Sequence, residues 1–206
     1  MSFELWIAFF VASSVLLAMP GPTVVLVVSY ALGRGKKSGW ATVPGVTLGD
    51  FTAMTASLLG AGAILATSAT LFTVLKLAGA AYLIWLGIKL WCAEPGLGEM
   101  QDVAISETKA AMFWNAYVVT ALNPKSIVFF IAFVPQFVDP TVSTTRQFVI
   151  LEATFLTLAA ANVALWAVLA GHMRARFERP ETLKFLNRTG ACFLVGAGIL
   201  TAAIRR

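Results

Sequence analysis

Long apolar runs alternate with short polar breaks along nearly the whole chain. Six runs are about 20 residues long or longer, which is the length that an α-helix needs to cross a bilayer. They fall at about 5–32, 40–66, 70–91, 112–135, 147–170 and 186–204. The weakest boundary is at 67–70, where the break carries no charge. The pattern predicts an all-α polytopic membrane protein with six transmembrane helices.

The composition excludes a soluble globular domain. The 206 residues are 59% hydrophobic and only 12% charged, and the mean hydropathy is +0.83. Such a chain has too little polar surface to cover a water-soluble fold. The six runs use nearly all of the length, so we expect residues 1–206 to form one transmembrane domain without a separate soluble catalytic domain.

The basic residues predict how the helices are oriented. A net charge of +5 could suggest nucleic acid in a soluble protein, but here Lys and Arg collect at helix ends, and short loops rich in them tend to stay cytoplasmic. We therefore expect no nucleic-acid binding, and both termini facing outward. The loops after the first, third and fifth runs hold Arg34, Lys36, Lys37, Lys89, Lys109, Arg174, Arg176, Arg179, Lys184 and Arg188, against Lys76, Arg146, Arg205 and Arg206 on the opposite side.

The sequence offers no pattern for a metal or redox centre. Cys92 and Cys192 are far apart and form no Cys-x-x-Cys pair, so they are better interpreted as packing residues. His172 is the one histidine and lacks a zinc-binding context. We expect no metal and no cofactor.

The third and sixth runs contain an internal repeat. At an offset of 111 residues they share six identities in 14 positions. The first and fourth runs show a weaker similarity at an offset of 104 residues, which aligns Pro20 with Pro124. Because each half would hold three helices, an odd number, the second half must be inverted relative to the first. We expect a 3+3 inverted repeat, with repeats at about 1–91 and 112–206 joined by a cytoplasmic loop at about 92–111. The identities are Leu75/Leu186, Gly79/Gly190, Ala80/Ala191, Leu83/Leu194, Gly87/Gly198 and Ile88/Ile199.

The segment Met19-Pro20-Gly21-Pro22 lies near the middle of the first run. Each proline lacks an N–H and displaces the carbonyl four residues earlier, so the oxygens of Leu16 and Ala18 lose their usual helical donors. At that depth free carbonyls must meet protein, water or ligand. The segment predicts either a simple kink or an unwound stretch that lines a cavity, and we favour the cavity.

Asn123-Pro124-Lys125 occupies the corresponding place in the fourth run. A half-helix that begins at Pro124 would present N–H groups and a positive dipole end, to which an anionic group could dock. Lys125 is too central to reach either interface easily, which indicates a polar cavity or a paired acid.

Asp50 is the one acid deep within a predicted span. An isolated carboxylate there would be costly, so it either makes a structural hydrogen bond or serves function. The preceding Gly45-x-x-x-Gly49 pattern would let another helix approach closely. Our hypothesis is that Asp50 binds a substrate amine, carries a coupling proton, or does both, while Lys125 and the broken helix ends receive a substrate carboxylate. Asn162 in the fifth run is a lesser polar candidate, for the site or for a bond between helices.

At these residues the chain resembles the bacterial amino-acid exporters that include lysine, homoserine/threonine and leucine efflux proteins. The similarity covers essentially the whole chain. Residues 75–87 of the third run and the Asn-Pro-Lys-Ser segment look most like the homoserine/threonine branch, whereas Gly49-Asp50 is similar to leucine-type members. The motifs are Met19-Pro20-Gly21-Pro22, Gly45-x-x-x-Gly49-Asp50, residues 75–87 (LKLAGAAYLIWLG), and Leu122-Asn123-Pro124-Lys125-Ser126 followed by Pro135-Gln136-Phe137.

The resemblance implies an exporter in the bacterial inner membrane that moves small neutral amino acids or homoserine derivatives outward by proton antiport. It implies a small-molecule substrate, a proton and the lipid bilayer as partners, with no cofactor. An ion or metal exporter of related architecture is the alternative, but such a carrier should offer several intramembrane ligands. A membrane enzyme would need a nucleophile with a base, or a metal centre, and the sequence shows neither. A homodimer stays open, because the repeated glycines could pack helices within one chain or between two.

Overall fold

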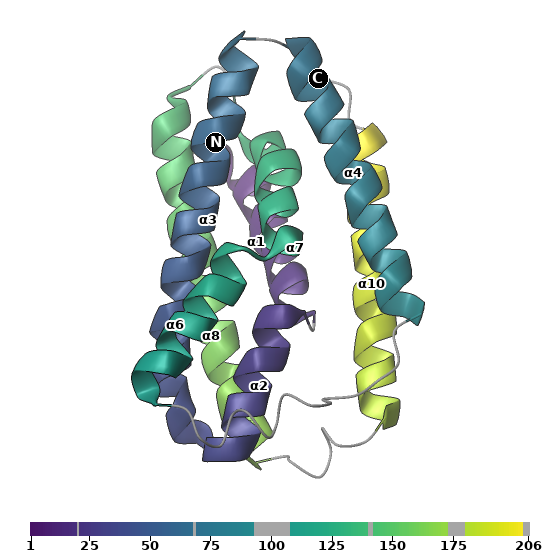
Figure 1. Cartoon of the computed structure of the whole chain (residues 1–206). Coiled ribbons are helices and arrows are strands. Elements are labelled where there is room, and N and C mark those ends of the chain that lie inside the picture. Colours follow the sequence, from purple (N-terminus) through teal and green to yellow (C-terminus); the bar gives the residue numbers. More distant parts are fainter. Residues whose placement is uncertain (20, 68, 93–107, 140–141, 173–179, 204–206) are drawn as a thin grey trace.

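All of the regular structure in the described part of the chain is helical. The computed structural model describes residues 1–206 except 20, 68, 93–107, 140–141, 173–179 and 204–206. The helices run roughly along one axis and form an elongated bundle (Figure 1). Both chain ends are marked at the same end of this bundle, opposite the turn that joins α2 to α3.

Each of the six apolar runs becomes a helix or an interrupted series of helices. The predicted boundaries agree with the observed ones to within about three residues, except that α10 begins six residues before the predicted start of the sixth run. The weak break at 67–70 separates two helices, one of which ends at Thr67 while the next begins at Ala69. Two runs are interrupted near their middles. The elements are α1 (Phe3–Ala18), α2 (Pro22–Arg34), the 3₁₀ turn η1 (Lys36–Ser38), α3 (Gly39–Thr67), α4 (Ala69–Cys92), α6 (Lys109–Ala121), α7 (Pro124–Val128), the π-helix η2 (Phe129–Phe133), the 3₁₀ turn η3 (Val134–Phe137), α8 (Thr144–His172) and α10 (Pro180–Ala203).

Local sequence signals explain where several helices begin. The hydroxyls of Ser2 and Thr108 accept hydrogen bonds from N–H groups in the first turns of α1 and α6, as side-chain oxygens at helix starts commonly do. Gly35 follows α2 with a φ of 76°, a conformation that glycine adopts without steric strain. This residue lets the chain reverse into η1 and α3.

Two helical stretches are long and apolar enough to cross a membrane, within the residues searched. They are 109–137 and 144–170, and the bent pair α1–α2 makes a third if it counts as one span. A shorter apolar helix covers 77–89 in α4. The described structure therefore supports a helical membrane protein.

Glycines bring α3 and α6 into close contact. A Cβ atom on Gly45 would collide with the backbone carbonyl oxygen of Phe113, and one on Gly49 would lie 2.8 Å from both Thr120 Cβ and the Tyr117 oxygen. The expectation that Gly45-x-x-x-Gly49 permits close helix approach is confirmed. This contact fixes α3 against α6 directly beside Asp50.

We expect Gly45→Ala to destabilise the protein by roughly 1–3 kcal/mol, because the added methyl group must push two backbones apart. Gly60→Ala on the same helix is the matched control, since a Cβ there meets nothing within 4 Å. The measurement is thermal unfolding of both purified variants in detergent. Equal melting temperatures for the two variants would contradict the tight packing.

The contact between α4 and α10 also depends on glycines. A Cβ on Gly87 would lie 2.8 Å from Val195 Cγ2 and 2.9 Å from the Ala191 oxygen. A Cβ on Gly198 would lie 2.7 Å from both the Ala80 oxygen and Ile84 Cγ1. Two of the four repeated glycines thus pack helices within one chain. A third, Gly79, faces Ala132 of η2 at 2.7 Å from its ideal Cβ position.

A cluster of phenylalanines from α1, η2, η3 and α8 packs in the core of the bundle. Neighbouring rings pack with centroids 4.9–6.1 Å apart, within the range of favourable aromatic contacts. The π-helix η2 supplies three of these rings from one irregular turn. The cluster, which we call the phenylalanine plug, consists of Phe9, Phe129, Phe130, Phe133, Phe137 and Phe155, each exposed by 9% or less.

Candidate functional site

The first apolar run is interrupted near its middle. Helix α1 ends at Ala18, Met19 takes an extended conformation, and α2 begins at Pro22 with extended Gly21 as its N-cap. The two helices meet at an angle of 53°. Pro22 starts α2 because proline is preorganised for the first helical position and needs no donor there. Pro20 lies outside the described residues.

The fourth run is interrupted at the corresponding place. Helix α6 ends at Ala121, and α7 begins at Pro124. The Asn123 side chain accepts a hydrogen bond of 3.1 Å from the Lys125 backbone N–H. Asn-Pro-Lys is therefore a local helix-start signal, with asparagine as the cap and proline in the first turn. The predicted break in this run is confirmed.

The Lys125 ammonium group reaches the broken end of α1. Its Nζ atom donates to the backbone oxygens of Leu16, at 3.2 Å, and Met19, at 3.3 Å, although only 8% of the residue is exposed. Carbonyl groups at a helix C-terminus lack intrahelical donors and carry partial negative charge, so a cation is stabilised there. The lysine thus adds a second donor to the Leu16 oxygen, which also accepts from the Met19 N–H at 3.3 Å, and supplies a donor to the Met19 oxygen.

Asp50 lies on α3 beside this ammonium group. It is 2% exposed, and its carboxylate interacts electrostatically with Lys125. Opposite charges that are both removed from water attract each other, which offsets part of the cost of burying them within a membrane. The structure thus brings the deep acid and the deep lysine together from two different apolar runs.

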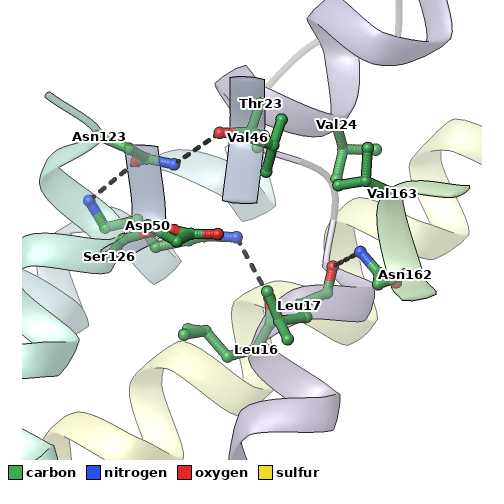
Figure 2. A pocket seen from close by; sticks show the side chains of 12 residues that line it. Leu16, Leu17, Thr23, Val24, Val46, Asp50, Asn123, Ser126, Asn162 and Val163 are labelled. Atoms are coloured by element: carbon green, nitrogen blue, oxygen red, sulfur yellow. Dashed lines mark hydrogen bonds between the residues drawn. The ribbon is translucent and has the colours of Figure 1, made fainter. Parts of the chain in front are cut away.

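A small closed cavity lies among these groups. Its volume is about 20 Å³, which is room for roughly one water molecule and too little for an amino acid. Figure 2 shows the lining side chains converging from α1, α2, α3, α7 and α8. In this conformation the site is therefore too small to hold a substrate. The lining residues are Leu16, Leu17, Gly21, Thr23, Val24, Val46, Asp50, Asn123, Lys125, Ser126, Asn162 and Val163.

Hydrogen bonds between side chains tie the two interrupted runs together, and a side chain on α8 bonds to the backbone of the first run. Asn123 Nδ2 donates to Thr23 Oγ1 at 3.3 Å, and the hydroxyls of Thr23 and Thr120 lie 3.2 Å apart (Figure 2 shows the first bond). Asn162 Nδ2 on α8 donates to the backbone oxygen of Leu17 at 2.9 Å. Asn162 thus both lines the cavity and makes the bond between helices that the sequence left as an alternative.

Half of the ten predicted site residues line this cavity. Gly21, Asp50, Asn123, Lys125 and Asn162 line it, whereas Pro22 and Pro124 shape it by starting α2 and α7. Gly45 and Gly49 lie behind it, in the contact between α3 and α6.

Three polar residues at the site were not singled out from the sequence. They are Thr23, Thr120 and Ser126. Thr23 directly follows the Met19–Pro22 segment, so its position in the first turn of α2 was the available signal. A threonine hydroxyl within a helix most often bonds to its own backbone, which gave no reason to expect a partner about 100 residues away.

The metal-ligating residue types do not gather here. Among the described residues, no three His, Cys, Asp or Glu side chains form a group that could hold a metal ion. The chemistry that the cavity offers is instead that of one carboxylate, one ammonium group, amide and hydroxyl groups, and open backbone carbonyls.

These features define a class of protein. Two interrupted helices meet around a closed polar cavity inside a bundle of apolar helices, which is the arrangement by which helical membrane transporters hold small solutes.

The chain belongs to the LysE-type translocator family, whose sequence profile matches residues 14–203. The resemblance to bacterial amino-acid exporters is thereby confirmed. The protein is a membrane transporter and not an enzyme.

The chain is similar to several bacterial membrane proteins over most of its length. It is 32% identical over 204 residues to the homoserine/homoserine lactone efflux protein of Salmonella typhimurium, which covers 98% of both chains. It is 31% identical over 205 residues to an uncharacterized membrane protein of Vibrio cholerae, covering all of both chains. It is 28% identical over 172 residues to the leucine efflux protein of an Enterobacter species, covering 84% of this chain and 81% of the relative. No solved structure matches the chain significantly.

Proposed function

We propose that this protein exports small neutral amino acids or their derivatives, such as threonine, homoserine, homoserine lactone or leucine-like compounds, across the bacterial inner membrane by proton antiport. The observation that carries the proposal is the buried Asp50–Lys125 pair at the meeting point of two interrupted helices. Family membership supports the direction of transport, because relatives over most of the chain are named efflux proteins.

The relatives' substrates indicate which chemical group the site recognises. Homoserine, its lactone and leucine all carry a primary amine on the α-carbon, but the lactone has no free carboxylate. A site shared by such compounds must hold the ammonium group and can use the carboxylate only where one is present. Asp50 is the acidic group suited to this task, since charge-assisted hydrogen bonds are the strong ones. When the substrate has a carboxylate, Lys125 and the helix starts at Pro22 and Pro124 are placed to receive it.

Asp50 also suits proton coupling. A carboxylate can bind either a proton or a substrate cation. If it binds only one of them at a time, a proton that binds on one side of the membrane is exchanged for a substrate cation. Proton entry from outside would then release the substrate, and proton loss to the cytoplasm would prepare the site for the next one. The closed cavity around Asp50 supports this scheme, because a site open to both sides would let protons pass uncoupled.

A 3+3 inverted repeat with six spans is part of the proposal. The offset of 111 residues relates Gly87 to Gly198, Ile84 to Val195 and Ala80 to Ala191. Gly87 lies against Val195 and Ala191, and Gly198 lies against Ile84 and Ala80, so the repeat relates one set of contacts between α4 and α10 to the other. Antiparallel helices that meet through repeat-related residues are what a pseudo-two-fold axis in the membrane plane would produce. Both chain ends lie at one end of the bundle, as an even number of spans requires (Figure 1).

The predicted orientation can be tested with reporter fusions. A C-terminal alkaline phosphatase fusion should be active and a C-terminal green fluorescent protein fusion dark, because the basic loops hold both termini outside. Insertion of each reporter into the 92–111 loop should give the opposite result. Bright fluorescence at the C-terminus would contradict the orientation.

Export itself is tested in cells that lack related exporters. Cells that express the protein should tolerate inhibitory threonine, homoserine, leucine or cysteine better than cells with empty vector, and preloaded radiolabelled substrate should leave them faster. A protonophore should abolish uphill efflux. Efflux that a protonophore leaves unchanged would refute proton coupling, and increased tolerance to metal ions in place of amino acids would favour an ion exporter.

A further inference from the structure

The end of α1 forms a set of oxygen acceptors around a single ammonium group. The Leu16 and Met19 oxygens accept from Lys125 Nζ at 3.2 and 3.3 Å, and the Asp50 carboxylate supplies the opposing charge. Gly21 lies against the same nitrogen atom, because a Cβ on it would be 3.1 Å from Nζ. The two carbonyl oxygens therefore lie at hydrogen-bond distances from the nitrogen, which are longer than the coordination distances of a small alkali cation, and Asp50 acts on it through its charge.

Lys125 is an unusual occupant for this position. Its side chain must leave water and lose rotamer freedom to reach the acceptors, and both changes oppose the buried conformation. Its ammonium group has the same three donors and the same charge as the ammonium group of an amino acid. The cavity beside it holds roughly one water molecule, so the acceptors have no space for a second ammonium group while the lysine is present.

We propose that these acceptors are the substrate ammonium subsite and that Lys125 is a tethered substitute that fills it when substrate is absent. This inference rests on the proposed function and deepens it. A primary ammonium compound enters by displacing Lys125, and the freed lysine then lies near the substrate carboxylate, where there is one. The subsite thus selects primary ammonium groups and rejects quaternary ones, which have no N–H donors.

The displacement gives the transporter a closed resting state without an empty charged site. With substrate absent, the carbonyls and Asp50 keep a cationic partner, so the buried acceptors are never left unsatisfied. With substrate present, one ammonium group replaces another at almost unchanged local charge. The exchange therefore removes a link between two helices, because Lys125 on α7 no longer bonds to the end of α1.

The test is chemical replacement of the lysine ammonium group. Purified Lys125→Ala protein in nanodiscs is heated with and without methylammonium chloride. We expect methylammonium to raise the melting temperature of this variant by roughly 2–4 °C, because it refills the vacated subsite. The wild-type melting temperature should change much less, because there methylammonium must displace the tethered lysine and gains no substrate contacts besides those of the ammonium group. Sodium and tetramethylammonium chloride should have no such effect on the variant.

Two controls separate this effect from general stabilisation. Leu151→Ala removes a fully buried side chain in the neighbouring core, and it should not respond to methylammonium. The double variant Asp50→Asn/Lys125→Ala should also respond weakly, because the opposing charge is gone. An equal response of Leu151→Ala, or an equal response of Lys125→Ala to sodium or tetramethylammonium, would overturn the proposal.

A measurement on the wild-type protein covers the case in which Lys125→Ala does not fold. A buried, hydrogen-bonded lysine ammonium group exchanges its protons slowly and gives a separate signal in a ¹⁵N-lysine NMR spectrum, assigned by its absence in Lys125→Arg. The signal should disappear when the amino acid that proves to be exported is added. A signal that persists at saturation would refute displacement. If the wild type exports substrate but neither the melting-temperature shift nor the loss of the NMR signal occurs, only the subsite is refuted. If methylammonium stabilises Lys125→Ala but the wild type exports nothing, only the export function is refuted.

Discussion

Asp50→Asn should reduce proton-coupled efflux at least about 100-fold, which corresponds to the loss of roughly 3 kcal/mol of charge-assisted bonding. The amide keeps the size of the carboxylate, but it can neither carry a proton nor hold a substrate cation with a full charge. The measurement is the initial rate of radiolabelled substrate efflux from loaded proteoliposomes with an imposed pH gradient, normalised to the amount of inserted protein.

Thr42→Val is the matched control for this substitution. Thr42 is a fully buried polar residue on the same helix, and its hydroxyl bonds to the Ser38 backbone oxygen, away from the cavity. We expect this variant to retain most of the wild-type efflux rate. An Asp50→Asn protein that is well inserted and transports at the wild-type rate would remove Asp50 from the mechanism.

Lys125→Met should destabilise the protein by about 3–5 kcal/mol, because it leaves a buried carboxylate without its opposing charge. It also removes the donor to the Leu16 and Met19 oxygens. The measurement is thermal unfolding in detergent, supported by the monodisperse fraction on size-exclusion chromatography.

The double variant Asp50→Asn/Lys125→Met should recover part of this stability, because neither charge is then buried alone. The coupling between the two substitutions should lie at the upper end of the roughly 0.5–3 kcal/mol range of contacting pairs. Neither variant should transport. Strictly additive effects on stability would show that Asp50 and Lys125 do not depend on each other.

The sequence predicted the positions of the helices well, because these depend on local signals. Apolar length defined all six helical runs, and proline identified both interruptions. Even the uncharged break near residue 68 lies between two separate helices. The expectation that Lys125 needs a polar cavity or a paired acid also agrees with the structure, because no local alternative could satisfy a charge at that depth.

The partners across the cavity could not be predicted in the same way. Lys125 donates to oxygens more than 100 positions earlier, and the sequence indicated open carbonyls at Leu16 and Ala18 without indicating what would meet them. The structure places the lysine on the Leu16 and Met19 oxygens and Asn162 on that of Leu17. Such bonds depend on how separate helices pack, which apolar periodicity does not specify.

The π-helical turn η2 was likewise not predicted. A run of phenylalanine, isoleucine and alanine predicts an ordinary helix, and the irregular backbone lies where Phe129 and Phe130 pack against Phe155 of α8. Aromatic packing of this kind selects a backbone conformation only after the neighbouring helices are in place.

The phenylalanine plug has a consequence for ion leakage through the transporter when no substrate is bound. Its rings are almost fully buried in one apolar cluster, and a hydrocarbon layer of that kind would exclude hydrated ions. We therefore expect a bacterium to keep many copies of this protein in its membrane without dissipating the membrane voltage. Any substitution that hydrates these rings should slow growth even where no solute is available to be carried.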